Sequence, residues 1–315
     1  FVEKASGIKS RHVIDKEGIL DINRMMPRVN NEHEDRLSIH AEVGIKAAKK
    51  AMKQASVISS DIDAVIVGSS HSARNYPAVA IEIQKELAIN GYAYDMLVGC
   101  SSTTFAINNA FSDIASGLAK TILVINPEIS TPAVNFTHRD KHFIFGDGCA
   151  ASIIQKDSSS KKSFRILDRK LFTQFSNNIR SNYSYLNRAA IDAKDNDDLL
   201  FHQYGRGVFK DVCPLVAKLI SDQLESNNID PKDISKFWLH QANGKMIRLI
   251  TSKILGTDDF DSTITPMPII NFGNLASVGS LFAFNLDNDL EAGQKGVICS
   301  FGAGYSVCSL IVEKT

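Results

Sequence analysis

The chain has 315 residues with 35 basic and 35 acidic side chains, so its formal net charge at neutral pH is zero. Without a net positive field, the composition gives no support for nucleic-acid binding. Apolar residues make up 44% and charged residues 22% of the chain, which is typical of a soluble globular protein with a sizeable core. No apolar run reaches the ~18 residues that a membrane-spanning helix needs, and no signal peptide is recognisable.

The five cysteines are scattered along the chain and form no C-x-x-C pair. This pattern argues against a disulfide framework or a zinc site and favours the reducing cytoplasm. His138 and His142 lie four residues apart, but no third metal ligand is evident beside them, so we expect no metal. Because the chain begins at Phe1 in the middle of an expected motif, we also expect that an N-terminal segment is missing.

Helical and strand patterns alternate through the first half of the chain. Residues 1–36 are polar and predict loops. Apolar side chains at helical spacing then alternate with short apolar runs. The predicted helices cover 38–54, 78–87 and the residues after Cys100, and the predicted strands cover 61–68, 92–98, 121–125 and 143–154. This alternation favours an α/β fold with a largely parallel sheet.

The second half begins after a polar linker at 157–163. An Asn- and Asp-rich stretch at 176–200 contains few apolar residues and predicts an inserted loop. A predicted helix at 208–225 and a predicted strand at 233–239 then continue the α/β pattern.

Two short motifs of the first half recur in the second. The matching pairs are Asp61-Ile62-x-x-Val65-Ile66-Val67 with Asp233-Ile234-x-x-Phe237-Trp238-Leu239, and Phe145-Gly146-Asp147-Gly148 with Phe301-Gly302-Ala303-Gly304. This repeat predicts two similar α/β halves, at 1–156 and 164–315, with a site between them.

Cys100 lies where a predicted strand meets a predicted helix. The apolar run ends at Val98, Gly99 permits a tight turn, and three small hydroxyl residues after Cys100 suit the start of a helix. A thiol at the first turn of a helix is stabilised as the nucleophilic thiolate by unpaired N–H groups and by the helix dipole. Taken alone, the stretch fits a buried core cysteine better, because free cysteines are among the most buried residues.

Three further stretches carry hydrogen-bonding or proton-transfer groups. His240 ends a predicted strand, Asn274 lies in a glycine-containing turn, and residues 301–304 offer backbone N–H groups suited to an oxyanion hole. Each has a structural alternative when taken alone: a satisfied strand-end histidine, a cap or turn residue, and a close-packed glycine turn.

Taken together and in this order, these stretches resemble the β-ketoacyl-acyl-carrier-protein synthase III family of condensing enzymes. The resemblance extends from residue 6 to the C terminus and rests on Cys100 after a strand, Phe145-Gly146-Asp147-Gly148, His240-Gln241-Ala242-Asn243, Phe272-Gly273-Asn274 with Ser277, and Phe301-Gly302-Ala303-Gly304. It implies the thiolase fold, in which two similar α/β halves form a five-layered α-β-α-β-α core, and a homodimer. The segments 15–36 and 176–200 are most similar to a subgroup that uses medium-chain starters, the β-ketodecanoyl synthases.

The resemblance implies a role for each residue of the Cys-His-Asn set. Cys100 would carry the acyl group of an acyl-CoA, and the N–H groups of Cys100 and Ala303 would hold the oxyanion. Malonyl-acyl-carrier protein would then bind, and His240 and Asn274 would stabilise the enolate that decarboxylation leaves for attack on the acyl thioester. No cofactor beyond the CoA thioester substrate is implied.

The chain departs from the family pattern at two motifs. The family's Ala-Cys-x-Gly is here Gly99-Cys100-Ser101-Ser102, and its Gly-Asn-Thr-Ser is here Gly273-Asn274-Leu275-Ala276-Ser277. Neither change removes a catalytic atom, but both leave the starter specificity open.

Four further residues match family positions that contact substrates or partners. Arg139 matches an arginine that stacks on the CoA adenine, and Phe1 falls where the family has an adenine-stacking tryptophan. Asn243 is expected to contact the substrate, and Lys245 matches a basic residue that docks the acidic carrier protein. For Lys245, a solvated surface lysine is the structural alternative.

Two other functions stay open at the level of sequence. One is a thiolase-fold enzyme that transfers acyl groups to oxygen or nitrogen, or condenses acyl-CoA pairs in secondary metabolism. The presence of both His240 and Asn274 disfavours plain acyl transfer, because decarboxylation needs both donors. The other is a catalytically silent partner that only binds acyl chains, which the complete Cys-His-Asn set argues against.

Overall fold

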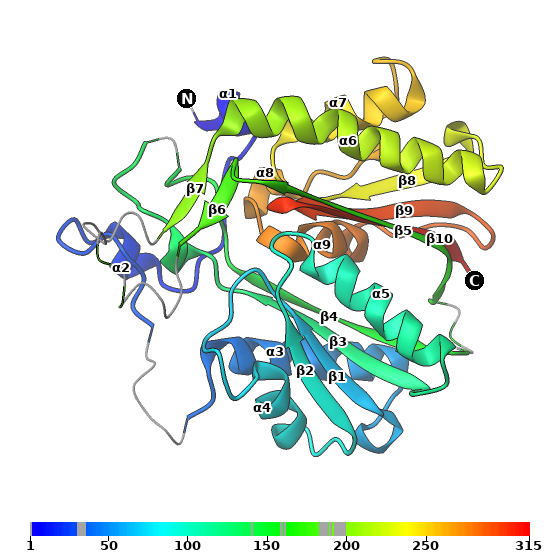
Figure 1. Ribbon diagram of the computed structural model, residues 1–315, viewed down its shortest axis with the longest axis horizontal. Coiled ribbons are helices and arrows are strands. Elements are labelled where there is room, and N and C mark those ends of the chain that lie inside the picture. The colour runs from blue at the N-terminus through cyan, green and yellow to red at the C-terminus, as the bar shows by residue number, and fades with distance from the viewer. Residues whose placement is uncertain are drawn as a thin grey trace.

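Two four-stranded sheets form the centre of the protein (Figure 1). The first has the strand order β2-β1-β3-β4 and the second β5-β10-β9-β8. Their bounds are β1 Ala64–Gly68, β2 Tyr92–Met96, β3 Thr121–Glu128, β4 Gly148–Gln155, β5 Phe164–Ser176, β8 Ile234–Leu239, β9 Lys295–Gly302 and β10 Gly304–Lys314. The computed structural model describes residues 2–29, 36–139, 141–157, 160, 162–182, 189, 191 and 200–315.

The two sheets share an arrangement of three strands. In the first sheet β1 runs parallel to β3, and β3 runs antiparallel to β4. In the second sheet β8 runs parallel to β9, and β9 runs antiparallel to β10. The repeated sequence motifs occupy equivalent places: Asp61 and Asp233 precede β1 and β8, whereas Phe145 and Phe301 precede β4 and β10. The repeat read from the sequence therefore corresponds to a structural repeat.

Helices form three layers around the two sheets (Figure 1). One pair covers the outer face of the first sheet, a second pair lies between the sheets, and a third pair covers the outer face of the second sheet. The pairs are α3 (Ile39–Ala55) with α4 (Val79–Glu86), α5 (Ser102–Ala115) with α9 (Gly279–Leu286), and α6 (Gly205–Ser226) with α7 (Gly244–Leu255). The result is a five-layered α-β-α-β-α core.

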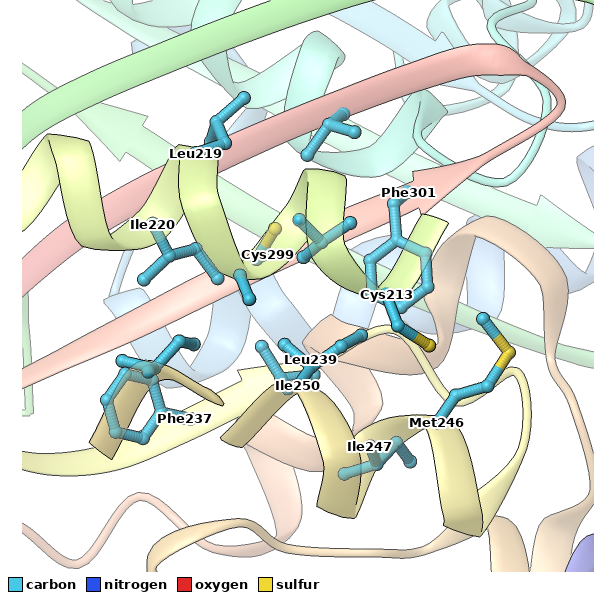
Figure 2. Packing of buried hydrophobic residues seen from close by; sticks show 14 of the residues in the cluster. Cys213, Leu219, Ile220, Phe237, Leu239, Met246, Ile247, Ile250, Cys299 and Phe301 are labelled. Atoms are coloured by element: carbon cyan, nitrogen blue, oxygen red, sulfur yellow. The ribbon is translucent and has the colours of Figure 1, made fainter. Parts of the chain in front are cut away.

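Strands β1 and β3 are buried along their whole length because helices cover both faces of their sheet. Alternate side chains of β3 therefore enter different cores: Ile122 packs in the central layer, and Leu123 packs against α3 and α4. The third core lies between the second sheet and helices α6 and α7, where Ile220, Phe237 and Ile250 are fully buried (Figure 2). Burying such a side chain contributes about 1.5–3 kcal/mol to folding.

Several boundaries agree with the sequence patterns. The helix expected at 38–54 is α3, which Ser38 caps by accepting a hydrogen bond from the backbone N–H of Ala41. The helix expected at 208–225 is α6, and the strand expected at 233–239 is β8. The strand expected at 143–154 is shorter, since β4 begins only at Gly148.

Two parts of the chain differ from the expectation. The N-terminal segment contains short helices, α1 (Val2–Ser6) and α2 (Lys16–Leu20), where loops were predicted, and Asp15 caps α2. Strand β5 has 13 residues and was not anticipated, because it is an edge strand with mostly half-exposed or exposed side chains and lacks an apolar run.

Short elements surround the expected insertion. Strand β6 (Ile179–Ser181) pairs antiparallel with β7 (Phe201–Gln203). Most of the expected loop at 176–200 lies outside the described residues. The remaining short helix, α8 (Ile269–Phe272), leads into the turn that carries Asn274.

Candidate active site

The nucleophile turn joins β2 to α5 and has the strand–turn–cysteine–helix form that the sequence predicts. Gly99 has a φ of +53°, a left-handed conformation that glycine adopts without strain. The backbone N–H of Val98 donates to Oγ of Ser102 at 2.8 Å, and Oγ of Ser101 donates to the Val98 carbonyl at 2.8 Å. These bonds hold Cys100 immediately before the helix.

The β9–β10 hairpin lies directly against this turn. A Cβ atom added at Gly302 would lie 2.5 Å from the Cβ of Cys100, so only glycine allows this approach. The backbone N–H groups of Ala303 and of Cys100 itself both favour the ionised sulfur and lower its pKa. The two N–H groups predicted to form an oxyanion hole therefore both act on the sulfur.

The ionisation of Cys100 differs from the expectation. Burial, and after it the negative charge of Glu128, raises the pKa of the thiol to about 12, while the Ser70 hydroxyl and the two N–H groups oppose this only in part. The helix start was expected to favour the thiolate, but desolvation outweighs the helix N-terminus at this position. In the free protein Cys100 is thus a thiol that must lose its proton during attack.

His240 follows β8, as its sequence context predicts, and is buried. Its backbone N–H donates to the Cys299 carbonyl at 2.8 Å, and its ring packs edge-on against Phe301 with centroids 5.1 Å apart. Burial lowers the pKa of the imidazole to about 4, although the backbone of Ala276 partly opposes this shift. The ring is therefore neutral at pH 7 and can donate a hydrogen bond without carrying a charge.

Asn274 lies in a hydrogen-bonded turn and is also buried. Gly273 before it has a φ of +72°, and the backbone of Asn274 bonds to Ile144 and Gly146 at 2.9 and 3.0 Å. Its side-chain Oδ1 accepts a hydrogen bond from the N–H of Ala276 at 2.9 Å. This bond orients the amide, so that Nδ2 is the group that can donate into the site.

Contacts around Ala276 bring the three parts of the site together. The backbone of Ala276 bonds to the side chain of Asn274 and acts on the ring of His240. Cys100 packs against the small apolar cluster that contains Ala276 and Phe145. Phe145, from the first half, also forms an isolated parallel bridge with Asn274.

The remaining predicted residues lie elsewhere. Arg139 and Lys245 are exposed. Asn243 caps α7: its Oδ1 accepts from the backbone N–H of Lys245 at 2.9 Å, and its Nδ2 donates to the Ala5 carbonyl at 3.2 Å. Both ends of the Asn243 amide therefore serve the fold. Phe1 lies outside the described residues.

Two residues beside Cys100 were not among the candidates predicted from sequence. Glu128 is fully buried at the end of β3, and the Oγ atom of Ser70 is also buried. The available signal was an acidic residue ending an otherwise apolar strand, because a fully buried carboxylate is rare without a specific reason. The influence of Glu128 on Cys100 came only from the tertiary structure.

The part of the chain that the structure describes has neither a metal cluster nor a membrane-spanning helix. No cluster of three or more His, Cys, Asp or Glu side chains there is arranged to hold a metal ion. None of the helices in that part of the chain is both long and apolar enough to span a membrane.

Comparisons with known proteins point to one family. Residues 94–174 match the model for 3-oxoacyl-[acyl-carrier-protein] synthase III, and residues 224–314 match the model for its C-terminal part. A beta-ketodecanoyl-[acyl-carrier-protein] synthase of Pseudomonas aeruginosa is 49% identical over 317 residues, which span 100% of this chain and 90% of that protein. A beta-ketoacyl-[acyl-carrier-protein] synthase III of a Chelativorans species is 28% identical over 84% of this chain and 81% of its own length.

Solved structures share the fold. The 3-oxoacyl-(acyl carrier protein) synthase III of Pseudomonas aeruginosa aligns with a TM-score of 0.79 at 19% identity, covering 99% of this chain and 88% of its own. The enzyme of Aquifex aeolicus aligns with a TM-score of 0.78 at 22% identity, covering 99% and 90%. The five-layered core is thus the thiolase fold, and the chain belongs to the 3-oxoacyl-[acyl-carrier-protein] synthase III family of condensing enzymes.

Proposed function

We propose that this protein catalyses the decarboxylative Claisen condensation of an acyl-CoA starter with malonyl-acyl-carrier protein and so opens fatty-acid elongation. The observation that carries the proposal is the pairing of a neutral His240 with an Asn274 amide whose Oδ1 is already occupied by Ala276. Neutral hydrogen-bond donors suit a developing enolate, because their bonds to the thioester oxygen strengthen as negative charge builds up on that oxygen in the transition state.

In the first half-reaction the sulfur of Cys100 attacks the acyl thioester and CoA leaves. The N–H groups of Cys100 and Ala303 stabilise the oxyanion of the tetrahedral intermediate, and the glycine at 302 allows the hairpin to come close enough. The acyl group then stays on Cys100 as a thioester, which stores it until the second substrate arrives.

In the second half-reaction malonyl-acyl-carrier protein loses carbon dioxide. The ring of His240 and Nδ2 of Asn274 donate to the thioester oxygen while the enolate forms, and the resulting carbanion attacks the carbonyl carbon of acyl-Cys100. The new carbon–carbon bond replaces the bond to sulfur, so that β-ketoacyl-carrier protein leaves and the Cys100 thiolate takes up a proton from water to become a thiol again.

A groove beside the nucleophile turn supports a medium-chain starter. Its volume is about 460 Å³, within the range of small-molecule sites. It is lined by residues 97–99, 173–175 and 303–306, and Leu97 and Phe175 in its wall are strongly exposed. The 49% identical relative is named a beta-ketodecanoyl synthase, which supports the same chain-length class.

The partners follow from the same proposal. We assign Arg139 to the CoA side, Phe1 to the adenine contact and Lys245 to docking of the acidic carrier protein, whereas Asn243, whose amide is bonded at both ends, is assigned to the fold. A homodimer is supported by the edge strand β2, which has a strand neighbour on only one side in the described sheet and leads directly into the Cys100 turn. The five free thiols support a cytoplasmic location.

Intact-mass measurement tests the function. The protein is incubated with acyl-CoAs from acetyl to dodecanoyl, beside Cys100→Ala and a Cys149→Ala control. A gain of one acyl group in the wild type and the control, absent from Cys100→Ala, is expected, and its release as β-ketoacyl-carrier protein after malonyl-carrier protein is added completes the cycle. A folded protein that no chain acylates would overturn the proposal and favour an acyl-binding partner without catalysis.

A further inference from the structure

Glu128 is a fully buried carboxyl group with an uneven set of partners. Its Oε1 accepts hydrogen bonds from the backbone N–H of Ser70 at 2.8 Å, from the backbone N–H of Ser277 at 3.2 Å and from the Ser277 hydroxyl. Its Oε2 is buried and accepts none. A buried carboxylate oxygen without a partner is costly, so its presence beside the active site calls for a reason.

Ser70 acts on both this carboxyl group and the nucleophile. Its hydroxyl is close enough to favour the ionised forms of both Cys100 and Glu128, yet its Oγ is buried and makes no hydrogen bond of good geometry in the free protein. Two unsatisfied polar atoms, Oγ of Ser70 and Oε2 of Glu128, therefore lie next to a thiol that must lose a proton.

Residues from several parts of the chain surround the carboxyl group of Glu128. Ser70 follows β1, Ser277 precedes α9, Cys100 follows β2 and Cys149 lies on β4. The charge of Glu128 raises the pKa of both thiols. Burial raises the pKa of Glu128 itself to about 7, because its hydrogen bonds oppose the desolvation only in part. The carboxyl group can therefore release and take up a proton near neutral pH.

We propose that Ser70 and Glu128 form a relay that takes the proton of Cys100 when its sulfur attacks the starter thioester. The S–H proton passes to Oγ of Ser70 while the Ser70 proton passes to Oε2 of Glu128, and the sulfur electron pair forms the new bond to the carbonyl carbon. When the carbon–sulfur bond to CoA breaks, Oγ of Ser70 gives a proton to the departing CoA thiolate and takes one back from Oε2 of Glu128. The inference rests on the proposed function.

A relay and a purely structural carboxylate predict opposite effects of Glu128→Gln. If the charge of Glu128 only disfavours the thiolate, then its removal lowers the pKa of Cys100 and accelerates reactions of the thiol. If Glu128 accepts the proton, its removal slows them, by about 10²-fold on the scale of general base catalysis. Ser70→Ala is expected to slow them similarly, and Ser70→Thr, which keeps the hydroxyl, is expected to restore much of the rate.

The measurement is the rate of Cys100 modification against pH, from 5 to 10, followed by intact mass with two reagents. Iodoacetamide reports the thiol without any biological substrate, and decanoyl-CoA reports acylation. For the wild type we expect the rate to rise with an apparent pKa near 7, and we expect this limb to disappear in Glu128→Gln and Ser70→Ala. The double variant is expected to be no slower than the slower single variant, because both changes interrupt one path.

The outcomes separate the relay from the function. Faster alkylation of Glu128→Gln, or an unchanged pH limb in Ser70→Ala, would overturn the relay whatever the acyl donor is. If the pH limb of alkylation disappears in both variants but no acyl-CoA acylates the wild type, the relay is retained and the proposed function is rejected. Ser70→Ala leaves the Ser70 N–H on Glu128, so it keeps the test decisive even if Glu128→Gln does not fold.

Discussion

Gly302 and Cys100 pack so closely that a single added carbon at position 302 would lie 2.5 Å from the Cβ of Cys100 and 3.2 Å from its backbone nitrogen. The two residues are far apart in sequence and come from opposite halves of the core. Because of this contact the β9–β10 hairpin packs against the nucleophile turn, and the backbone N–H of Ala303 lies close enough to the sulfur to lower the pKa of Cys100.

Gly302→Ala is expected to move the hairpin away from Cys100, because neither backbone can absorb this overlap. We expect a loss of about 1–3 kcal/mol in stability and a fall of about 10²-fold or more in acylation rate, since one oxyanion donor is displaced. Urea unfolding and the rate of intact-mass gain measure the two effects. The matched control is Gly205→Ala, where the added carbon meets no atom closer than 3.9 Å; equal behaviour of the two variants would contradict the argument.

Asn274→Asp is expected to separate the two half-reactions. An aspartate keeps an oxygen for the N–H of Ala276 but cannot donate to an enolate oxygen, and its charge opposes the developing negative charge. Acylation of Cys100 should therefore persist, while condensation falls by about 10²–10³-fold. Intact mass measures the first step and product formation from malonyl-carrier protein the second. Loss of acylation as well would place Asn274 in the first step or in the fold.

His40 links stability to pH. Both ring nitrogens are buried without hydrogen bonds, and burial, followed by the nearby His71, lowers the pKa of His40 to about 4, while Glu82 opposes the shift. Below its unfolded pKa of about 6.5 the unfolded chain binds a proton that the folded protein refuses. The contribution of His40 is therefore complete above pH 6.5 and lost as the pH falls towards 4.

The check is the unfolding free energy of the wild type and His40→Leu at pH 5, 6 and 7. Near pH 5 the unfolding free energy of the wild type should fall by up to about 1.4 kcal/mol more per pH unit than that of His40→Leu. The reason is that the unfolded wild type binds one proton at His40 that the folded protein does not, and the variant lacks this difference. Above pH 7 the difference between the two proteins should become constant. Parallel curves over the whole range would mean that His40 is not held neutral.

Much of the local structure around Cys100, His240 and Asn274 could be predicted from sequence, because it depends on residues that are close together along the chain. The turn at Gly99, the small hydroxyl residues after Cys100, the strand end at His240 and the glycine turn before Asn274 all depend on residues within a few positions of one another. The repeated motifs also predicted two related sheets, since each repeat brings its own strands and covering helices.

Other features depended on neighbours that are remote in sequence. Strand β5 is specified by its pairing with β10 rather than by its own pattern. Asn243 was read as a substrate contact, and only the fold shows its amide spent on Lys245 and Ala5. Whether such a side chain is free is a property of what surrounds it.

The amino-acid sequence by itself determined the order of the elements and the repeat, because short-range backbone preferences and apolar periodicity encode them. It pointed to the Cys-His-Asn set only through its resemblance to the condensing enzymes. Only the tertiary structure decided the protonation of that set. Burial raises the pKa of Cys100, which keeps it a thiol, and lowers the pKa of His240, which keeps its imidazole neutral. Folding also brings the carboxyl group of Glu128 beside the sulfur. The physical reason is that a pKa depends on desolvation and on charges that folding brings together from distant parts of the chain.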